Sequence, residues 1–181
     1  MKATGIVRRI DDLGRVVIPK EIRRTMRIRE GDPLEIYTDR EGEVIFKKYS
    51  PIGELAGFAA QYAETLHKTC SMAVIICDRD AVIACAGLPR KLYADKPFTD
   101  ALEQIIESRG LYMHKEGAPQ IAAVEDGDDH YVSCAMPILS EGDLIGCVAS
   151  LASAEGSSMD SELESKLIIT AAGFLGRQLE A

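Results

Sequence analysis

The chain has 181 residues, of which 46% are hydrophobic and 28% charged, as in an ordinary folded protein with room for two modest domains. No run comes near the roughly 18 apolar residues that span a bilayer, and the first residues lack the apolar core of a signal peptide. We therefore expect a cytoplasmic protein without membrane contact. Five cysteines, an odd number with no Cys-x-x-Cys pair, argue against a disulfide framework and fit a reducing compartment.

Charge is divided unevenly along the chain, although the net charge of −8 by itself argues against a nucleic-acid partner. Residues 1–50 carry 12 basic and 9 acidic side chains, a net +3, whereas residues 51–181 carry 9 basic and 20 acidic side chains, a net −11. Such asymmetry is typical of a polyanion-binding module joined to a second domain, or of a solvated basic face. Charge alone leaves both interpretations open.

The first 50 residues predict a small, strand-rich module. In chain order we expect an extended segment over 4–10, a turn over 11–14, a short strand over 15–18, a helix over 20–27, and a hairpin over 34–47. Gly14 allows positive φ in the turn, and Pro19 suits the start of the helix. Because the first two strands carry apolar residues on both sides and no disulfide or metal staple is present, we expect a second copy to complete the core.

The remaining residues predict an α+β domain. Ser50-Pro51 is a candidate helix start, and an apolar repeat of helical period follows it. Further along we expect strands over 74–77 and 82–86, a helix capped by Asp100 and Glu103, strands over 131–139 and 144–151, a loop at 156–158, and a last helix over 163–179. The predicted domains are thus 1–50, a linker helix over 51–70, and 71–181.

The run from Thr4 to Met26, with Gly14-Arg15-Val16-Val17-Ile18-Pro19 at its centre, closely resembles the AbrB family of bacterial transition-state regulators. The resemblance implies a swapped-hairpin β-barrel built by two chains, which binds double-stranded DNA through arginines. By position, the DNA-binding residues would be Arg8, Arg9, Arg15, Arg23 and Arg24. An arginine presents a planar fork of donors suited to phosphate or to a guanine edge.

The segments Ile75–Asp80 and Ala171–Leu175, together with the element order, resemble a GAF domain. The combination with an AbrB-like module is similar to a sporulation regulator of spore-forming Firmicutes, which implies activation and repression of late sporulation genes in the forespore. A GAF domain would place a small-molecule site around 92–112, beside strand 132–136; retention for assembly alone is the open alternative. The apolar stripes of helix 52–68 and of the last helix predict a homotetramer.

Other functions have less support in the sequence. The spacing His67-x-x-Cys70 supplies only two ligands, and the acidic loop 125–130 lacks the ligand spacing of a calcium loop. We find no nucleophile–base pair and no phosphate-binding glycine loop, so we expect neither an enzyme nor a metal or cofactor site. Antitoxins use the same N-terminal module followed by a disordered tail, whereas residues 51–181 have the apolar periodicity of a folded domain.

Overall fold

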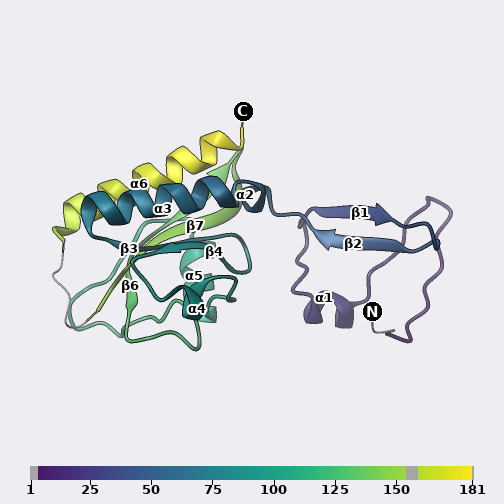
Figure 1. Ribbon diagram of the computed structural model, residues 1–181. Coiled ribbons are helices and arrows are strands. Elements are labelled where there is room, and N and C mark those ends of the chain that lie inside the picture. Colours follow the sequence, from purple (N-terminus) through teal and green to yellow (C-terminus); the bar gives the residue numbers. More distant parts are fainter. Residues whose placement is uncertain (1–3, 154–158, 181) are drawn as a thin grey trace. The chain divides into compact units, whose positions relative to one another are not determined.

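The computed structural model describes residues 4–153 and 159–180 (Figure 1). The chain divides between Tyr49 and Ser50 into two compact units. The loop predicted at 156–158 lies outside the described residues.

In its described residues, 4–49, the first unit contains one short helix and one hairpin. These are α1 (Lys20–Thr25), β1 (Leu34–Thr38) and β2 (Val44–Lys48). Strands β1 and β2 are antiparallel, with Ile36 opposite Phe46 at the centre. The predicted turn is also present, because the Gly14 amide donates to the Asp11 carbonyl at 3.0 Å and Gly14 has φ of +75°. The predicted turn, helix and hairpin are therefore confirmed.

The extended segments around the turn differ from their prediction, because neither 4–10 nor 15–18 forms a strand. Beyond the turn bond, their pairing in the described chain is limited to the Asp11 amide, which donates to the Arg15 carbonyl at 3.0 Å. A β-strand requires a neighbouring strand to accept and donate along its length. Among residues 4–153 and 159–180 of a single chain, these two segments have no such neighbour.

The first unit leaves much of its apolar surface in contact with solvent. Val7 is 84% exposed and Val17 70% exposed, and α1 contains no buried residue. Other exposed apolar side chains of this unit are Ile10, Leu13, Met26, Ile36, Val44 and Phe46. A folded chain normally buries side chains of this kind, since each contributes about 1.5–3 kcal/mol when fully removed from water.

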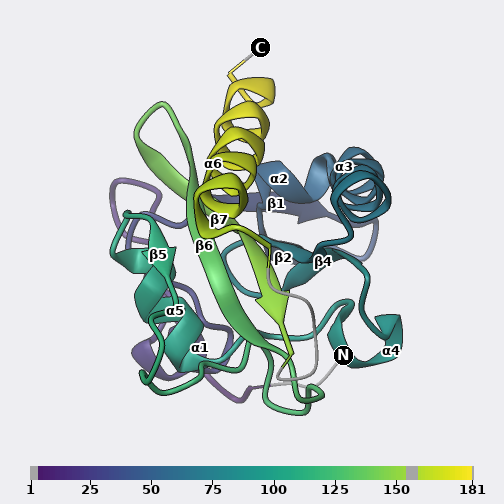
Figure 2. The ribbon, with the colours of Figure 1, turned by 90° about the vertical axis from the view of Figure 1, so that its left-hand side faces the viewer.

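The second unit is a five-stranded antiparallel sheet between two layers of helices (Figures 1 and 2). The strand order is β4-β3-β7-β6-β5. The strands are β3 (Ala73–Cys77), β4 (Val82–Ala86), β5 (Tyr112–Met113), β6 (Tyr131–Ser140) and β7 (Asp143–Ala152). The helices are α2 (Pro51–Glu54), α3 (Ala56–Cys70), α4 (Arg90–Tyr93), α5 (Asp100–Glu107) and α6 (Ser161–Gln178). The predicted α+β class and both predicted hairpins are confirmed.

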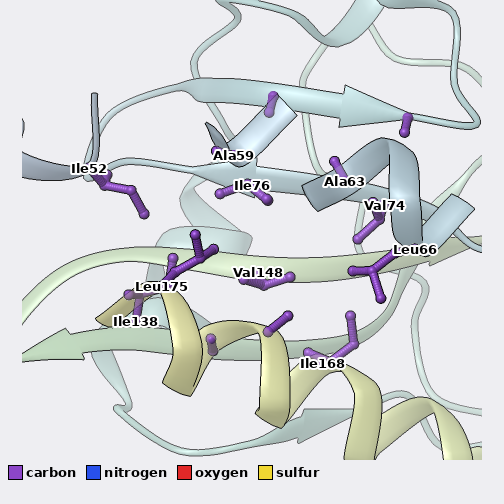
Figure 3. Packing of buried hydrophobic residues seen from close by; sticks show 14 of the residues in the cluster. Ile52, Ala59, Ala63, Leu66, Val74, Ile76, Ile138, Val148, Ile168 and Leu175 are labelled. Atoms are coloured by element: carbon purple, nitrogen blue, oxygen red, sulfur yellow. The ribbon is translucent and has the colours of Figure 1, made fainter. Parts of the chain in front are cut away.

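Helices α3 and α6 cover one face of the sheet and bury a first core cluster with it (Figure 3). Ala59, Ala63 and Ile168 are fully buried there, against Val74 and Val148 from the strands. The linker helix expected over 51–70 is thus corrected: α2 and α3 belong to the second unit and supply part of its core. Their small and apolar residues at helical spacing pack on the sheet rather than bridging two domains.

Helices α4 and α5 lie on the opposite face, where a second core cluster fills the space between helices and sheet. Tyr93, Phe98 and Leu102 are 5% exposed or less, and they pack on Val132 and Ala149 of the strands. The small-molecule site that the sequence places around 92–112 therefore coincides with packed side chains.

Two helix starts show how local sequence determines the elements. The Ser50 hydroxyl accepts from the Gly53 amide, with Pro51 at the first helical position, as predicted. Helix α5 corrects its prediction, because the capping side chain is Thr99 rather than Asp100. The Thr99 hydroxyl accepts from the Leu102 amide and donates to the Ala122 carbonyl. The hydrogen bond from Thr99 to the Ala122 carbonyl, 23 residues further along the chain, favours Thr99 over Asp100 as the capping residue.

Candidate nucleic-acid interface

The turn of the first unit holds Arg15 in a defined position. The Asp11 carboxylate accepts from the backbone amides of Leu13 and Arg15, at 3.0 and 2.7 Å, and from the Arg15 Nε at 2.8 Å. The Arg15 side chain is 69% exposed. Hydrogen bonds from the Arg15 backbone and side chain hold the pKa of Asp11 below its ordinary value. The turn thus presents a guanidinium to solvent.

Helix α1 presents two further arginines. Arg23 and Arg24 are exposed and lie in its last turn, where positive charge is favourable beside the carbonyl end of the helix dipole. Ile22 is half-buried, so the arginines point away from the side chain that packs inward. In the sequence the same separation follows from the helical spacing of Ile22 and Met26, although Met26 is 56% exposed in the single chain.

Arg8 and Arg9 precede the turn and are also exposed. The Arg8 Nη1 donates to the neighbouring Val7 carbonyl at 3.3 Å. All five predicted arginines therefore lie in one unit and in contact with solvent, from three local pieces of chain: the extended segment, the turn and the end of α1.

Sequence reasoning did not single out Lys48, which ties the hairpin to the loop after α1. Its Nζ donates to the Arg27 carbonyl at 2.8 Å and lies 3.5 Å from Asp32. The Asp32 side chain is only 2% exposed and also accepts from the Arg29 amide. Lys48 is thus a structural cation, whereas neighbouring Lys47 lies over the Tyr37 ring, 4.5 Å from its centroid. Because successive side chains of β2 point to opposite faces of the hairpin, Lys47 and Lys48 make these different contacts.

The acidic loop before β6 is more ordered than its sequence indicates. In the acidic loop 125–130, Asp128 accepts from the Tyr93 hydroxyl at 2.6 Å and lies 2.7 Å from His130 Nδ1. Burial raises the pKa of Tyr93, and the bond to Asp128 adds to that effect. Burial alone would raise the pKa of Asp128, but the bonds from Tyr93 and His130 outweigh it and lower it. This network fixes the loop to α4.

The histidine and cysteine that the sequence offers as candidates for other chemistry lie in packed or hydrogen-bonded positions. His67 Nδ1 lies 2.9 Å from the Met72 carbonyl, so it joins α3 to the following loop. Across the residues that the structure describes, no group of three or more potential metal-binding side chains is present. Burial raises the pKa of the Cys77 thiol well above its ordinary value, which disfavours the reactive thiolate. Within 4–153 and 159–180, no helix is both long and apolar enough to cross a membrane.

Comparison with known proteins places both units. Residues 54–180 match the family described as stage V sporulation protein T C-terminal, transcription factor, and residues 7–53 match the MazE bacterial antitoxin family. Stage V sporulation protein T of Bacillus subtilis (strain 168) is 51% identical over 181 residues, covering 99% of both chains. The chain belongs to the stage V sporulation protein T family. The sporulation regulator predicted from the order of the two domains is thereby confirmed.

Two further relatives correspond to the separate units. The transition state regulatory protein AbrB of Bacillus subtilis is 65% identical over 51 residues, which cover 28% of this chain and 52% of AbrB. The GAF domain/HD domain protein from Geobacter sulfurreducens is 16% identical with a TM-score of 0.50, and the match covers 71% of this chain and 91% of that structure. The AbrB-like module and the GAF-like fold predicted from the sequence are confirmed.

Proposed function

We propose that this protein is a DNA-binding transcription regulator of sporulation whose first unit contacts the duplex through Arg8, Arg9, Arg15, Arg23 and Arg24. The observation that carries the proposal is the display of these five exposed arginines on a module of net charge +3 that is 65% identical to AbrB. A guanidinium suits both phosphate and the guanine edge, and phosphate contacts supply most sequence-independent affinity.

The test is duplex binding by the full-length protein as a function of salt. If a dimer neutralises about eight phosphates, log K should fall against log salt with a slope of about −7. Arg15→Ala and Arg23→Ala should each weaken binding several-fold or more. Arg23→Ala should also make the slope shallower by about two, because a dimer loses two phosphate contacts. Arg40→Ala, which removes the same charge from the turn between β1 and β2, serves as the control. Binding that is equal in all four proteins would remove the assignment.

The proposal includes a dimer in which two first units complete one swapped-hairpin barrel. Exposed apolar side chains on the extended segments, such as Val7 and Val17, support it, as does the lack of a ladder partner for these segments within the described chain. A second chain would supply both the missing hydrogen bonds and the missing burial. A two-fold dimer also doubles the arginines and aligns them with a two-fold duplex site.

The second unit is proposed to join two such dimers into a tetramer. Phe58 and Tyr62 of α3 and Phe174 of α6 form an aromatic cluster with ring centroids 5.7 to 6.4 Å apart, in which Tyr62 is half-buried. Phe58 and Phe174 are 36% and 40% exposed, and Ile169 on α6 is 41% exposed. Phe174→Glu should convert the tetramer to a dimer in sedimentation velocity, with Arg177→Glu as the control. A tetramer that survives Phe174→Glu would place the second interface elsewhere.

The antitoxin alternative has a specific difficulty in the second unit. Residues 7–53 match the MazE antitoxin family, but an antitoxin tail that neutralises a toxin is disordered before binding. Here residues 50–153 and 159–180 contain a five-stranded sheet with two buried core clusters. A folded domain of this kind supports regulation through assembly rather than through a flexible tail.

A further inference from the structure

Arg15 differs from the other four arginines of the proposed DNA-binding surface. Its Nε donates to the Asp11 carboxylate at 2.8 Å, whereas in the described part of the chain no other member of the set is bonded to a carboxylate. Arg8 bonds only to the backbone carbonyl of Val7 through its side chain. The pair therefore gives one arginine an orientation that the others lack.

The Asp11 side chain is itself fixed. Its Oδ1 accepts from the Leu13 and Arg15 amides, which leaves Oδ2 to face the Arg15 Nε. The carboxylate is held by the turn backbone and remains ionised at neutral pH, since the bonds from Arg15 keep its pKa low. The backbone of residues 11–15 consequently holds the Asp11 carboxylate in one position, and the carboxylate in turn holds the Arg15 side chain.

Anchoring at Nε has a direct chemical consequence for the guanidinium. A guanidinium is planar, so fixing Nε sets the direction of the Nη1 and Nη2 donors at the opposite end. Neither Nη atom has a hydrogen-bond partner among residues 4–153 and 159–180. Two parallel donors at a fixed angle match the O6 and N7 acceptors of guanine in the major groove.

The negative charge beside Arg15 also discriminates between phosphate and base. A carboxylate next to the guanidinium cancels much of its attraction for a polyanion and repels an approaching phosphate oxygen. The guanine edge carries no net charge, so it incurs less of that repulsion. An anchored side chain also loses less rotamer freedom on binding than a free one.

We propose that Asp11 is a positioning residue that directs Arg15 to a base edge, so that this pair sets sequence selectivity while the unpaired arginines supply general affinity. The proposal rests on the proposed function, since it requires that the first unit bind DNA. It assigns to Asp11, an acidic residue on a surface for DNA, a favourable role in recognition.

The test compares Asp11→Asn with Asp12→Asn in the full-length protein. Both substitutions remove one negative charge from the same turn, but only Asp11 bonds to Arg15, and the asparagine oxygen can still accept from the turn amides. The probes are a duplex selected from a random pool by the wild-type protein and a scrambled duplex of the same composition. The quantity measured is the ratio of the two dissociation constants.

We expect Asp11→Asn to lower the ratio of the dissociation constant for the scrambled duplex to that for the selected duplex by about fivefold or more. One good bidentate base contact favours the correct base over a wrong one by about that factor or above. Binding to the scrambled duplex should become tighter as the freed Arg15 engages phosphates. Asp12→Asn should shift both dissociation constants together and leave the ratio unchanged. Equal ratios in the two variants would overturn the proposal.

A double-mutant cycle with Arg15→Ala separates this proposal from the proposed function. If Asp11 acts through Arg15, Asp11→Asn should leave the ratio unchanged in an Arg15→Ala background. An effect of equal size in both backgrounds would overturn the positioning role. If Arg15→Ala binds DNA like the wild type, the assignment of Arg15 fails; if it weakens binding while Asp11→Asn behaves as Asp12→Asn does, the positioning role fails alone.

A measurement without DNA covers the case in which Asp11→Asn disturbs the turn. The Nε–H resonance of Arg15 should be resolved in NMR spectra of the free wild-type protein and in Asp12→Asn, and should be lost in Asp11→Asn. Unchanged backbone resonances of Leu13 and Gly14 would show that the turn is kept. A resonance that persists in Asp11→Asn would contradict the anchoring.

Discussion

The two units of this chain differ in how far they bury their apolar side chains. In the second unit the side chains of both core clusters are at most 8% exposed, whereas in the first unit Val7, Val17 and Ile10 are all at least 69% exposed. These exposed side chains of the first unit lie in the segments 4–10 and 15–18, which form no strand, whereas the strands of the second unit pair in one sheet. The second unit therefore completes its core within one chain, and the exposed apolar side chains of the first unit support the proposal that a second chain covers them.

The largest effect is expected from a charge placed on the exposed apolar surface of the first unit, which tests whether a second chain covers that surface. Val17→Asp should abolish dimer formation and weaken duplex binding by about 100-fold or more, because a buried unpaired charge is very costly. Leu111→Asp, at a site of the second unit that is 42% exposed, is the control and should have little effect. Sedimentation and mobility-shift assays measure the two outcomes. A dimeric, DNA-binding Val17→Asp protein would mean that this surface faces solvent.

The packing of the second unit can be tested at two glycines of one helix. A Cβ at Gly176 would overlap the Leu139 carbonyl oxygen, whereas a Cβ at Gly173 would meet nothing within 4 Å. Gly176→Ala should lower the free energy of unfolding by about 2 kcal/mol or more, since helix α6 must move away from the sheet. Gly173→Ala should raise it by roughly 0.5–1 kcal/mol through helix propensity. Denaturant melts of both variants decide; equal effects would contradict close packing at Gly176.

The loop network on the other face gives a somewhat smaller effect. Asp128→Ala should destabilise the second unit by about 1–3 kcal/mol, because the buried Tyr93 hydroxyl loses its acceptor. Exposed Asp129→Ala should change little. Since the folded pKa of Asp128 lies below its ordinary value of 3.8, its stabilisation is present above that pH and disappears as pH falls through the folded pKa. The free energies of unfolding of wild type and Asp128→Ala should approach each other as pH falls from 6 to 3; a constant difference would show that the ionised Asp128 carboxylate is not what stabilises the loop.

The smallest effect is expected at the start of the second unit. Ser50→Ala removes the hydroxyl that accepts from the Gly53 amide and should cost about 1 kcal/mol. If α2 is part of the second unit, only the unfolding transition of that unit should shift. A shift confined to the first unit would instead assign this helix to the first unit.

Much of the local structure could be predicted because short-range rules decide it. Gly14 accommodates positive φ in the turn, Ser50 and Pro51 start a helix, and alternating residues form the hairpin of the first unit. The candidate site could be placed for the same reason, since the five arginines lie in a contiguous motif. The Asp11–Arg15 bond was missed, although the separation of the two residues by a four-residue turn was a signal that could have revealed it.

The sequence by itself determined the hairpins of both units, the first and last helices of the second unit, the division of charge between the units and the identity of the exposed arginines. Tertiary structure decided which residues meet across long separations: Thr99 caps α5 because it also reaches Ala122, and Asp128 finds Tyr93 at 35 positions' distance. Such pairings depend on how the sheet brings distant segments together, and hydrophobic burial, which drives that approach, is not directional. Local patterns fix where elements begin and end, and packing fixes their partners.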